Sequence, residues 1–186
     1  MEILDIVDEN GIPTGETVER GRAHREGIRH RTAHLWLVRR KNGKIEILLQ
    51  KRSAEKDSYP GCYDISSAGH IPAGIDYRSS AVRELKEELG IKADEEDLIP
   101  CGLRRFFYQN TFHNQPFSDN QVSMVFCLPM DMDEKQFVLQ TEEVESVCWI
   151  GLEECIQAVE KDSFPNCIRM EELLMLKRTL EKTDIL

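Results

Sequence analysis

The strongest signal in the chain comes from two neighbouring segments, Gly69-His70-Ile71-Pro72-Ala73-Gly74-Ile75-Asp76 and Arg83-Glu84-Leu85-Lys86-Glu87-Glu88-Leu89-Gly90-Ile91. Apolar residues recur at helical spacing within and just before the second segment, namely Ala81, Val82, Leu85 and Leu89. Asp76 stands where an N-cap belongs, and Gly90 stands where a left-handed C-cap belongs. The pattern therefore predicts an amphipathic helix between these two residues, with its leucines buried.

The polar side of this predicted helix carries three glutamates close together. At roughly 100° per residue, Glu84, Glu87 and Glu88 share an arc of about 100° on the side facing away from the leucines. Like charges this close repel one another, and a bound divalent cation would remove that conflict. Oxygen ligands on one rigid face suit Mg²⁺ or Mn²⁺. Arg83 precedes Glu87 by one helical turn, so it can brace that carboxylate.

The carboxylates alone leave a plainer interpretation open, because glutamate-rich helix faces are commonly just solvated. Two glycines ahead of the helix favour the ligand interpretation. Gly69 and Gly74 allow a backbone carbonyl to approach the helix closely. The strand–loop–helix order would also hold the carboxylates rigidly.

Outside this region, strand and helix patterns follow one another along the chain. Asn42-Gly43 predicts a tight hairpin between strands 34–38 and 45–50, since both residues tolerate positive φ. Further strands are expected at 3–7, 63–67, 103–109, 122–128 and 147–150, and further helices at 152–161 and 166–181. A polar loop should join the strands at 103–109 and 122–128, whereas residues 17–30 are polar with little period. These elements predict a mixed α/β or α+β sandwich.

The same pattern suggests how the chain is organised. We expect residues 1–30 to form an N-terminal strand and turn extension, residues 31–165 the main domain, and residues 166–186 a C-terminal helix. The leucines of that last helix can pack on the core or on a second subunit, and we expect the core. A homodimer stays open as an alternative.

Composition excludes several classes of protein. Of the 186 residues, 40% are hydrophobic and 31% charged, which is typical of a globular protein. The 24 lysines and arginines against 34 aspartates and glutamates give a net charge of −10. Such a chain repels phosphate backbones, so no nucleic-acid polymer is expected as a partner. No apolar run approaches the ~18 residues that a membrane span requires, so no membrane association is expected.

The cysteines and the N-terminus indicate a cytoplasmic protein. The six cysteines include no C-x-x-C pair, which argues against a cysteine-rich zinc site. Several lie in apolar strings such as Val125-Phe126-Cys127-Leu128, where cysteine acts as a small core residue. We therefore expect reduced thiols. The acidic start, Met1–Asp5, lacks a secretory pattern.

The glycine and glutamate segments resemble the Nudix box, G-x5-E-x7-R-E-U-x-E-E-x-G-U, in which U is aliphatic. The matching residues are Gly69, Arg83, Glu84, Leu85, Glu87, Glu88, Gly90 and Ile91. The isolated glutamate of the box is Ile75 here, and we expect the adjacent Asp76 to cap the helix rather than replace it.

The resemblance implies an α/β/α sandwich with a mixed β-sheet. It also implies metal-dependent hydrolysis of a diphosphate linked to another group, with Mg²⁺ or Mn²⁺ as the cofactor. Glu84, Glu87 and Glu88 would be the metal ligands, aided by the Gly69 carbonyl. Glu84, Glu87 and Arg83 would be the catalytic residues, with Arg83 orienting the glutamates.

A longer resemblance links the chain to isopentenyl-diphosphate isomerases and their hydrolase-like bacterial relatives. It rests on Asp8–Gly15, Arg22-Ala23-His24, His30, Leu48–Ser53 and Pro60-Gly61, and the two resemblances together cover residues 3–150. In the isomerases three histidines help to hold a metal, and His24, His30 and His70 occupy the matching places.

Two other positions depart from the isomerases. The cysteine that protonates the alkene falls here on Ala68, and the essential second-site glutamate falls on Gln121, with Asp119 at a neighbouring ligand position. Protonating an unactivated alkene needs a positioned acid, and neither residue can supply one. Isomerase activity is therefore not expected.

A diphosphate also requires cations and a proton acceptor. Arg52 and Lys51 end a strand expected near the glutamate helix, and arginine can bind phosphate through two parallel hydrogen bonds. We predict these two residues and His70 as substrate-binding. The proton acceptor could be Glu84 or Glu87, or a glutamate of the loop before Trp149, at 142, 143 or 145.

The leading hypothesis is a hydrolase that cleaves the diphosphate linkage of a nucleoside diphosphate or a related small molecule. A non-catalytic nucleotide sensor on a degraded box is an alternative favoured by Ile75. The isomerase is a second alternative, opposed by Ala68 and Gln121.

Overall fold

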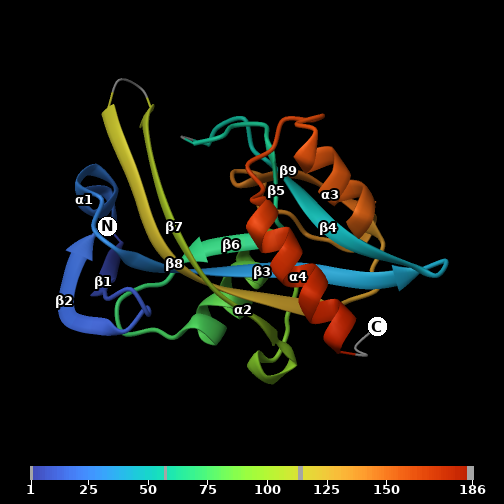
Figure 1. The fold of residues 1–186 in the computed structure, drawn as a ribbon, viewed down its shortest axis with the longest axis horizontal. Coiled ribbons are helices and arrows are strands. Elements are labelled where there is room, and N and C mark those ends of the chain that lie inside the picture. Colours follow the sequence, from blue (N-terminus) through green and yellow to red (C-terminus); the bar gives the residue numbers. More distant parts are fainter. Residues whose placement is uncertain (1, 57, 113–114, 184–186) are drawn as a thin grey trace.

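A seven-stranded sheet forms the centre of the computed structural model, which describes residues 2–56, 58–112 and 115–183 (Figure 1). Its strands run in the order β5-β4-β3-β8-β7, with β6 paired to β3 and β9 paired to β4. The pairing of β3 with β8 is parallel and the others are antiparallel, so the sheet is mixed. The strands are β3 (His30–Lys41), β4 (Lys44–Arg52), β5 (Tyr63–Asp64), β6 (Ser67–His70), β7 (Ile99–Phe112), β8 (Gln115–Pro129) and β9 (Val144–Gly151).

Helix α2 (Tyr77–Leu89) covers one face of the sheet. The Asp76 carboxylate accepts hydrogen bonds from the amides of Arg78 and Ser79, at 2.8 and 3.0 Å. Gly90 ends the helix with φ +72°. Both predicted caps are therefore confirmed. The leucines at 85 and 89 are fully buried against β3, as the apolar period predicts.

Helices α3 (Leu152–Glu160) and α4 (Met170–Lys182) cover the other face. Leu173, Leu176 and Leu180 of α4 pack against Trp36 and its neighbours on the sheet. The expectation that the last helix packs on the core is thus confirmed. The mixed sheet between helical layers also confirms the predicted α/β/α sandwich.

The N-terminal region has more regular structure than its sequence predicts. Strands β1 (Ile3–Val7) and β2 (Pro13–Glu19) form a separate two-stranded sheet, followed by α1 (Arg20–Glu26). The Glu19 carboxylate caps α1 by accepting from the amides of Gly21 and Arg22. Residues 17–30, which are polar with little period, thus hold the end of β2 and a capped helix whose Ala23 is fully buried with Leu4 and Val18. The domain boundaries at residues 30 and 165 remain predictions.

The hairpin of β7 and β8 is longer than the sequence suggests and projects beyond the rest of the sheet (Figure 1). Its register runs from Ile99↔Cys127 to Phe112↔Gln115, so most of the predicted loop over 109–120 is strand. Backbone pairing sustains these polar strands without the apolar alternation that sequence analysis relies on. Residues 113 and 114 of the predicted loop lie outside the described part of the chain.

Two short 3₁₀ helices, Glu95–Asp97 and Glu134–Gln136, complete the elements. In the part of the chain that the structure covers, every helix is too short or too polar to cross a membrane. All six cysteine thiols are free, in agreement with the sequence prediction.

Candidate active site

A cavity of about 950 Å³ opens between α1, α2, β6, the β7–β8 pair and the start of α4. Its size is that of a small-molecule site. The sheet register explains its inner wall, because Thr32 lies opposite His70 and His34 lies opposite Ala68. Directly opposed residues project from the same face of a sheet. These side chains therefore line the cavity together.

The three glutamates of α2 reach this cavity from one side. Gly69 on β6 makes room for the first of them, since a Cβ at this position would overlap the Glu84 carboxyl group. The glycine predicted from the sequence thus allows a carboxylate to lie against the backbone of β6. Any larger residue would displace Glu84.

Two of these carboxylates are held where a negative charge is unfavourable. Burial raises the pKa of Glu84 to about 7 and that of Glu88 to about 8. Among the described residues, Oε2 of Glu88 is buried and has no hydrogen-bond partner. Crowded carboxylates with an unpartnered buried oxygen fit a divalent cation, which would restore the charged forms.

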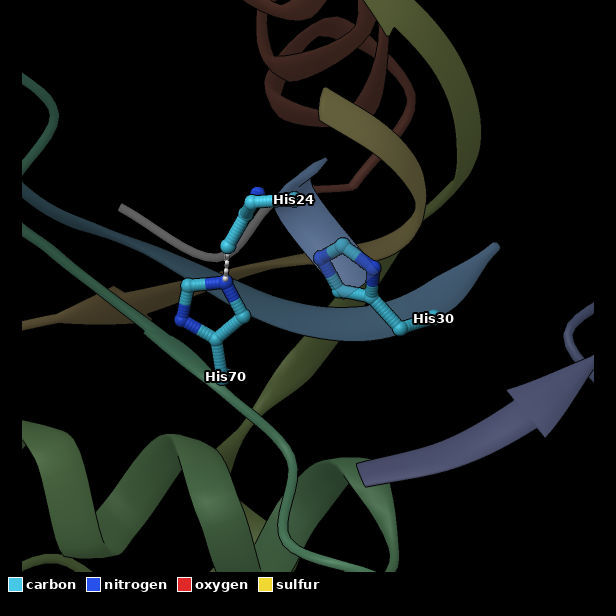
Figure 2. A group of neighbouring side chains, drawn as sticks. All are labelled: His24, His30 and His70. Atoms are coloured by element: carbon cyan, nitrogen blue, oxygen red, sulfur yellow. Dashed lines mark hydrogen bonds between the residues drawn. The ribbon is translucent and has the colours of Figure 1, made fainter. Parts of the chain in front are cut away.

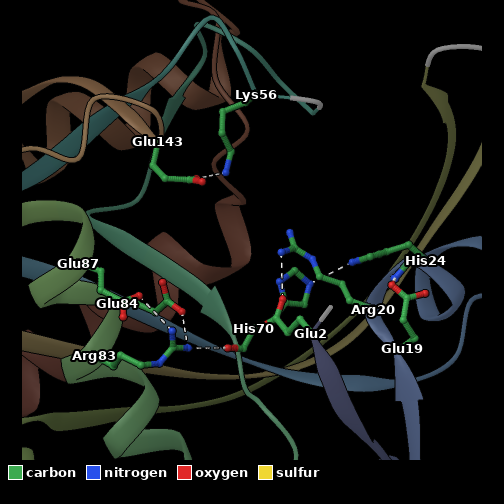
Figure 3. A network of polar contacts seen from close by, with 11 residues as sticks. Glu2, Glu19, Arg20, His24, Lys56, His70, Arg83, Glu84, Glu87 and Glu143 are labelled. Atoms are coloured by element: carbon green, nitrogen blue, oxygen red, sulfur yellow. Dashed lines mark hydrogen bonds and ion pairs between the residues drawn. The ribbon is translucent and has the colours of Figure 1, made fainter.

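Arg83 ties this group together, as Figure 3 shows. Its guanidinium lies 2.6 Å from Oε1 of Glu84 and 3.1 Å from Oε2 of Glu87. It also donates to the backbone carbonyl of His70, at 3.2 Å. The arginine therefore links two glutamates of the helix to the strand that faces them. Glu87 keeps a half-exposed side chain.

A second group of possible ligands lies in the same cavity. The rings of His24, His30 and His70 gather at the junction of α1, β3 and β6 (Figure 2). One ring nitrogen from each lies within 4.8 Å of the others. Oδ1 of Asp119 lies 3.8 Å from both His24 Nδ1 and His30 Nε2. We call these four residues the histidine cluster.

The protonation states of the histidine cluster suit a bound metal ion. Burial lowers the pKa of His24 to about 4 and lowers the pKa of His30 and His70, so the rings are neutral and keep a lone pair. Within the described chain, His24 Nδ1, His30 Nε2 and Asp119 Oδ1 are buried without hydrogen-bond partners. Neutral imidazoles and one carboxylate match the donors that Zn²⁺, Mn²⁺ or Fe²⁺ accept.

The predicted phosphate-binding cations are not all brought to the cavity. Arg52 lines it, with its guanidinium 3.1 Å from Asp64 and 2.9 Å from the carbonyl of Ser58. Lys51 does not line the cavity and pairs instead with Glu145, at 2.7 Å. Lys56 lines the cavity instead and pairs with Glu143 (Figure 3).

Several other polar residues of the cavity wall escaped sequence analysis. Arg20 of α1 lines the wall beside its partner Glu2, at 3.0 Å. Arg104 and Glu172 meet there from β7 and α4. A signal exists only for Glu172, which is a charged residue among the buried leucines of a helix. For Arg20 and Arg104 the sequence offers no signal, since their surroundings depend on distant pairings.

The positions that differ from the isomerases also lie in the cavity wall. Ala68 presents a methyl group and Gln121 a neutral amide. Neither provides an acid, as the sequence predicts. Of the three loop glutamates, those at 142 and 143 line the cavity.

Comparisons with known proteins agree with this geometry. A model of the NUDIX domain matches residues 28–179. The chain is 36% identical to Nudix hydrolase 3 of Arabidopsis thaliana over 165 residues, which make up 87% of this chain and 21% of that protein. The chain thus spans only about a fifth of the length of that relative. It is 35% identical to an uncharacterized Nudix hydrolase of Clostridium acetobutylicum, covering 82% of this chain and 71% of the relative.

Further matches come from an isomerase and from solved structures. An isopentenyl-diphosphate Delta-isomerase of Corynebacterium diphtheriae is 27% identical over 88% of this chain and 86% of that protein. A crystal structure from Deinococcus radiodurans superposes with a TM-score of 0.66 at 17% identity, covering 95% of this chain and 98% of that one, which supports the fold. A C. elegans Ap4A hydrolase complex superposes with a TM-score of 0.57 at 25% identity, covering 82% of this chain and 98% of that one.

Proposed function

The chain belongs to the Nudix family of hydrolases, and on that premise we propose that it cleaves the diphosphate linkage of a nucleoside diphosphate or a related small molecule with a divalent cation. The observation that carries the proposal is the carboxylate group of α2 beside Gly69. Three glutamates line one side of a cavity that is large enough for a diphosphate and an attached organic group.

Glu84, Glu87 and Glu88 would hold Mg²⁺ or Mn²⁺, with the Gly69 carbonyl as a further ligand. The raised pKa of Glu84 and Glu88 and the unpartnered oxygen of Glu88 fit this role. When bound, such a cation supplies charge neutralisation for the diphosphate oxygens and makes water more acidic. Side chains of the protein would accept the proton and bind the diphosphate.

Glu87 is the proton acceptor in this proposal. Its side chain is 51% exposed and lines the cavity, so water can reach it. Arg83 holds one of its oxygens at 3.1 Å, which fixes the direction of the carboxylate. A positioned carboxylate of this kind typically contributes a rate factor of about 10²–10⁴ as a general base. Arg83 acts as a positioning residue, because it contacts Glu84 and Glu87 rather than the reacting atoms.

Three cations of the wall would bind the diphosphate. Arg52, Lys56 and Arg20 each line the cavity and each pair with a carboxylate of the protein. A diphosphate would replace those carboxylates as the partner. Charge-assisted hydrogen bonds from arginine and lysine are among the strongest that a phosphate accepts.

The histidine cluster would hold a second cation. His24 Nε2 and His70 Nε2 share a hydrogen bond of 3.0 Å, whereas His24 Nδ1, His30 Nε2 and Asp119 Oδ1 are buried without a hydrogen-bond partner among the described residues (Figure 2). We assign to it the role of an additional metal site next to the diphosphate. His70 belongs to this cluster and lines the cavity, and the substrate contact predicted for it from the sequence stays a prediction.

Release of phosphate from a panel of nucleoside diphosphates in the presence of Mg²⁺ tests the proposal. The wild-type protein should turn over at least one compound, and Glu87→Gln should lose about a hundredfold or more in rate because the proton acceptor is gone. Lys51→Ala is the matched control, since Lys51 lies outside the cavity. Nucleotide binding without turnover in any metal would instead support the sensor, and isomerisation of isopentenyl diphosphate would support the isomerase.

A further inference from the structure

Arg104 on β7 places a buried guanidinium in the wall of the cavity. The residue is only 3% exposed and nevertheless lines the cavity. It lies opposite Ser123 of β8, which lies opposite Thr32 of β3. Arg104 therefore projects from the same sheet face as Thr32 and His70.

Its only ionic partner among the described residues is Glu172 of α4. Nε of Arg104 lies 3.1 Å from Oε2 of Glu172. The same carboxylate accepts a hydrogen bond from Trp36 Nε1 at 3.0 Å and contacts His34 Nδ1 at 3.0 Å. Glu172 is thus surrounded by three partners, and the Arg104–Glu172 pair is close to neutral as a unit.

The guanidinium itself is not satisfied. Nε and Nη1 of Arg104 are both buried and have no hydrogen-bond partner within the part of the chain that is described, so the contact with Glu172 is an ion pair without a hydrogen bond. A buried donor without an acceptor destabilises the folded protein. An acceptor from outside the chain would remove this penalty, and the cavity is the space from which it can come.

The donor is also held in a fixed direction. Cζ of Arg104 lies 4.9 Å from the centroid of the Phe106 ring, and Cζ of Arg169 lies 4.6 Å from that same centroid. Contact with an aromatic ring restricts a guanidinium, whose hydrogen-bonding geometry is already rigid. A donor with a fixed direction can discriminate between the ligand groups that face it.

We propose that Arg104 determines the base specificity of this site by donating a hydrogen bond to a ring carbonyl oxygen of the nucleoside base. The preferred substrates are therefore keto-bearing bases such as hypoxanthine, guanine or uracil, in preference to adenine. This inference rests on the proposed function, because it concerns the organic group attached to the diphosphate.

The chemistry of arginine sets the direction of this preference. Arginine only donates, so a carbonyl oxygen satisfies it whereas an amino group at the same place does not. A hydrocarbon group would leave the donor unpaired altogether. A neutral carbonyl also suits a guanidinium already paired with Glu172, while Arg20, Arg52 and Lys56 remain for the diphosphate.

Inosine diphosphate and ADP provide a matched test, because they differ at position 6 of the purine, which is a carbonyl in one and an amino group in the other. Their affinities are measured by calorimetry with Mg²⁺ on the wild-type protein, with the α,β-methylene analogues of both nucleotides, whose bridging carbon prevents hydrolysis of the diphosphate linkage. Inorganic diphosphate serves as the probe that lacks a base. We expect inosine diphosphate to bind about tenfold more tightly than ADP, or better.

Two variants test whether Arg104 causes this base preference. Arg104→Met alone leaves Glu172 without its cation, so the double variant Arg104→Met/Glu172→Gln, which removes both charges, is measured beside it. In the double variant the two nucleotides should bind equally, while the affinity for inorganic diphosphate stays within about twofold. Arg105→Met is the control, because Arg105 contacts Glu9 and Asn10 outside the cavity.

Any of the following results would overturn the inference: equal or tighter binding of ADP by the starting protein, a preference that survives in the double variant, or loss of the preference in Arg105→Met. Failure to bind either nucleotide while inorganic diphosphate binds would also overturn it. These outcomes are read from binding, so they are independent of phosphate release, whose absence would overturn the proposed function alone.

Discussion

Replacing Glu88 by glutamine should make the metal-free protein more stable at neutral pH. Burial raises the pKa of this carboxyl from its ordinary value of 4.5 to about 8, and its residue is only 7% exposed. Between these two values the folded state holds a proton that the unfolded state has released. The free energy of unfolding therefore falls as the pH rises through this window.

The size of the effect follows from the pKa shift. At about 1.36 kcal/mol per pH unit, the step from pH ~5.5 to pH ~7.5 should cost the wild-type protein about 2–3 kcal/mol through Glu88. This stabilisation is fully present below the pKa that Glu88 has in the unfolded state. It is lost as the pH rises through the pKa that Glu88 has in the folded state. The glutamine side chain in Glu88→Gln cannot titrate. The free energy of unfolding of this variant should therefore fall by about 2–3 kcal/mol less than that of the wild type over the same pH step.

Urea unfolding followed by tryptophan fluorescence, in the presence of a chelator, measures the difference. Glu87→Gln is the matched control, because it removes a half-exposed carboxylate from the same helix and leaves the buried Glu88 in place. Millimolar Mg²⁺ should restore the stability of the wild type at pH ~8 and leave that of Glu88→Gln nearly unchanged. Parallel pH profiles for wild type and Glu88→Gln would refute the reasoning.

Three further substitutions test separate parts of the account. Gly69→Ala should weaken Mg²⁺ binding in calorimetry about tenfold or more, because its Cβ overlaps the Glu84 carboxyl; unchanged affinity would show that Glu84 is not a ligand. Lys56→Ala should raise the KM for a diphosphate substrate about tenfold, whereas Lys51→Ala should not, and the opposite order would place the phosphate elsewhere. Asp76→Ala should lower the free energy of unfolding by about 1 kcal/mol, since it removes the N-cap of α2, and a change near zero in urea titration would contradict that role.

The parts of the fold that the sequence predicts are those decided by neighbouring residues. The bounds of helix α2 are predictable because Asp76, the leucine period and Gly90 all lie within one short segment. The β3–β4 hairpin follows from Asn42 and Gly43 in the same way. The sequence underestimates the β7–β8 hairpin because its outer pairing depends on the partner strand rather than on its own apolar alternation.

The candidate site is likewise predictable only where residues that are close in the sequence decide it. The Nudix resemblance named the carboxylates and Gly69, and the structure places them together in one cavity. The choice between Lys51 and Lys56 depends on how the loop after β4 folds back to Glu143, which no local pattern encodes. The Arg104–Glu172 pair joins a strand to a helix distant in the chain, so only the assembled fold reveals it.

Calorimetric titration of Mg²⁺ into metal-free protein at pH ~8 tests most directly whether α2 carries a cation site. The wild type should take up the ion, more tightly once a diphosphate compound is present, and Glu84→Gln should lose most of this binding. Absence of uptake at millimolar Mg²⁺ with a diphosphate compound present, or equal uptake by Glu84→Gln, would contradict the account.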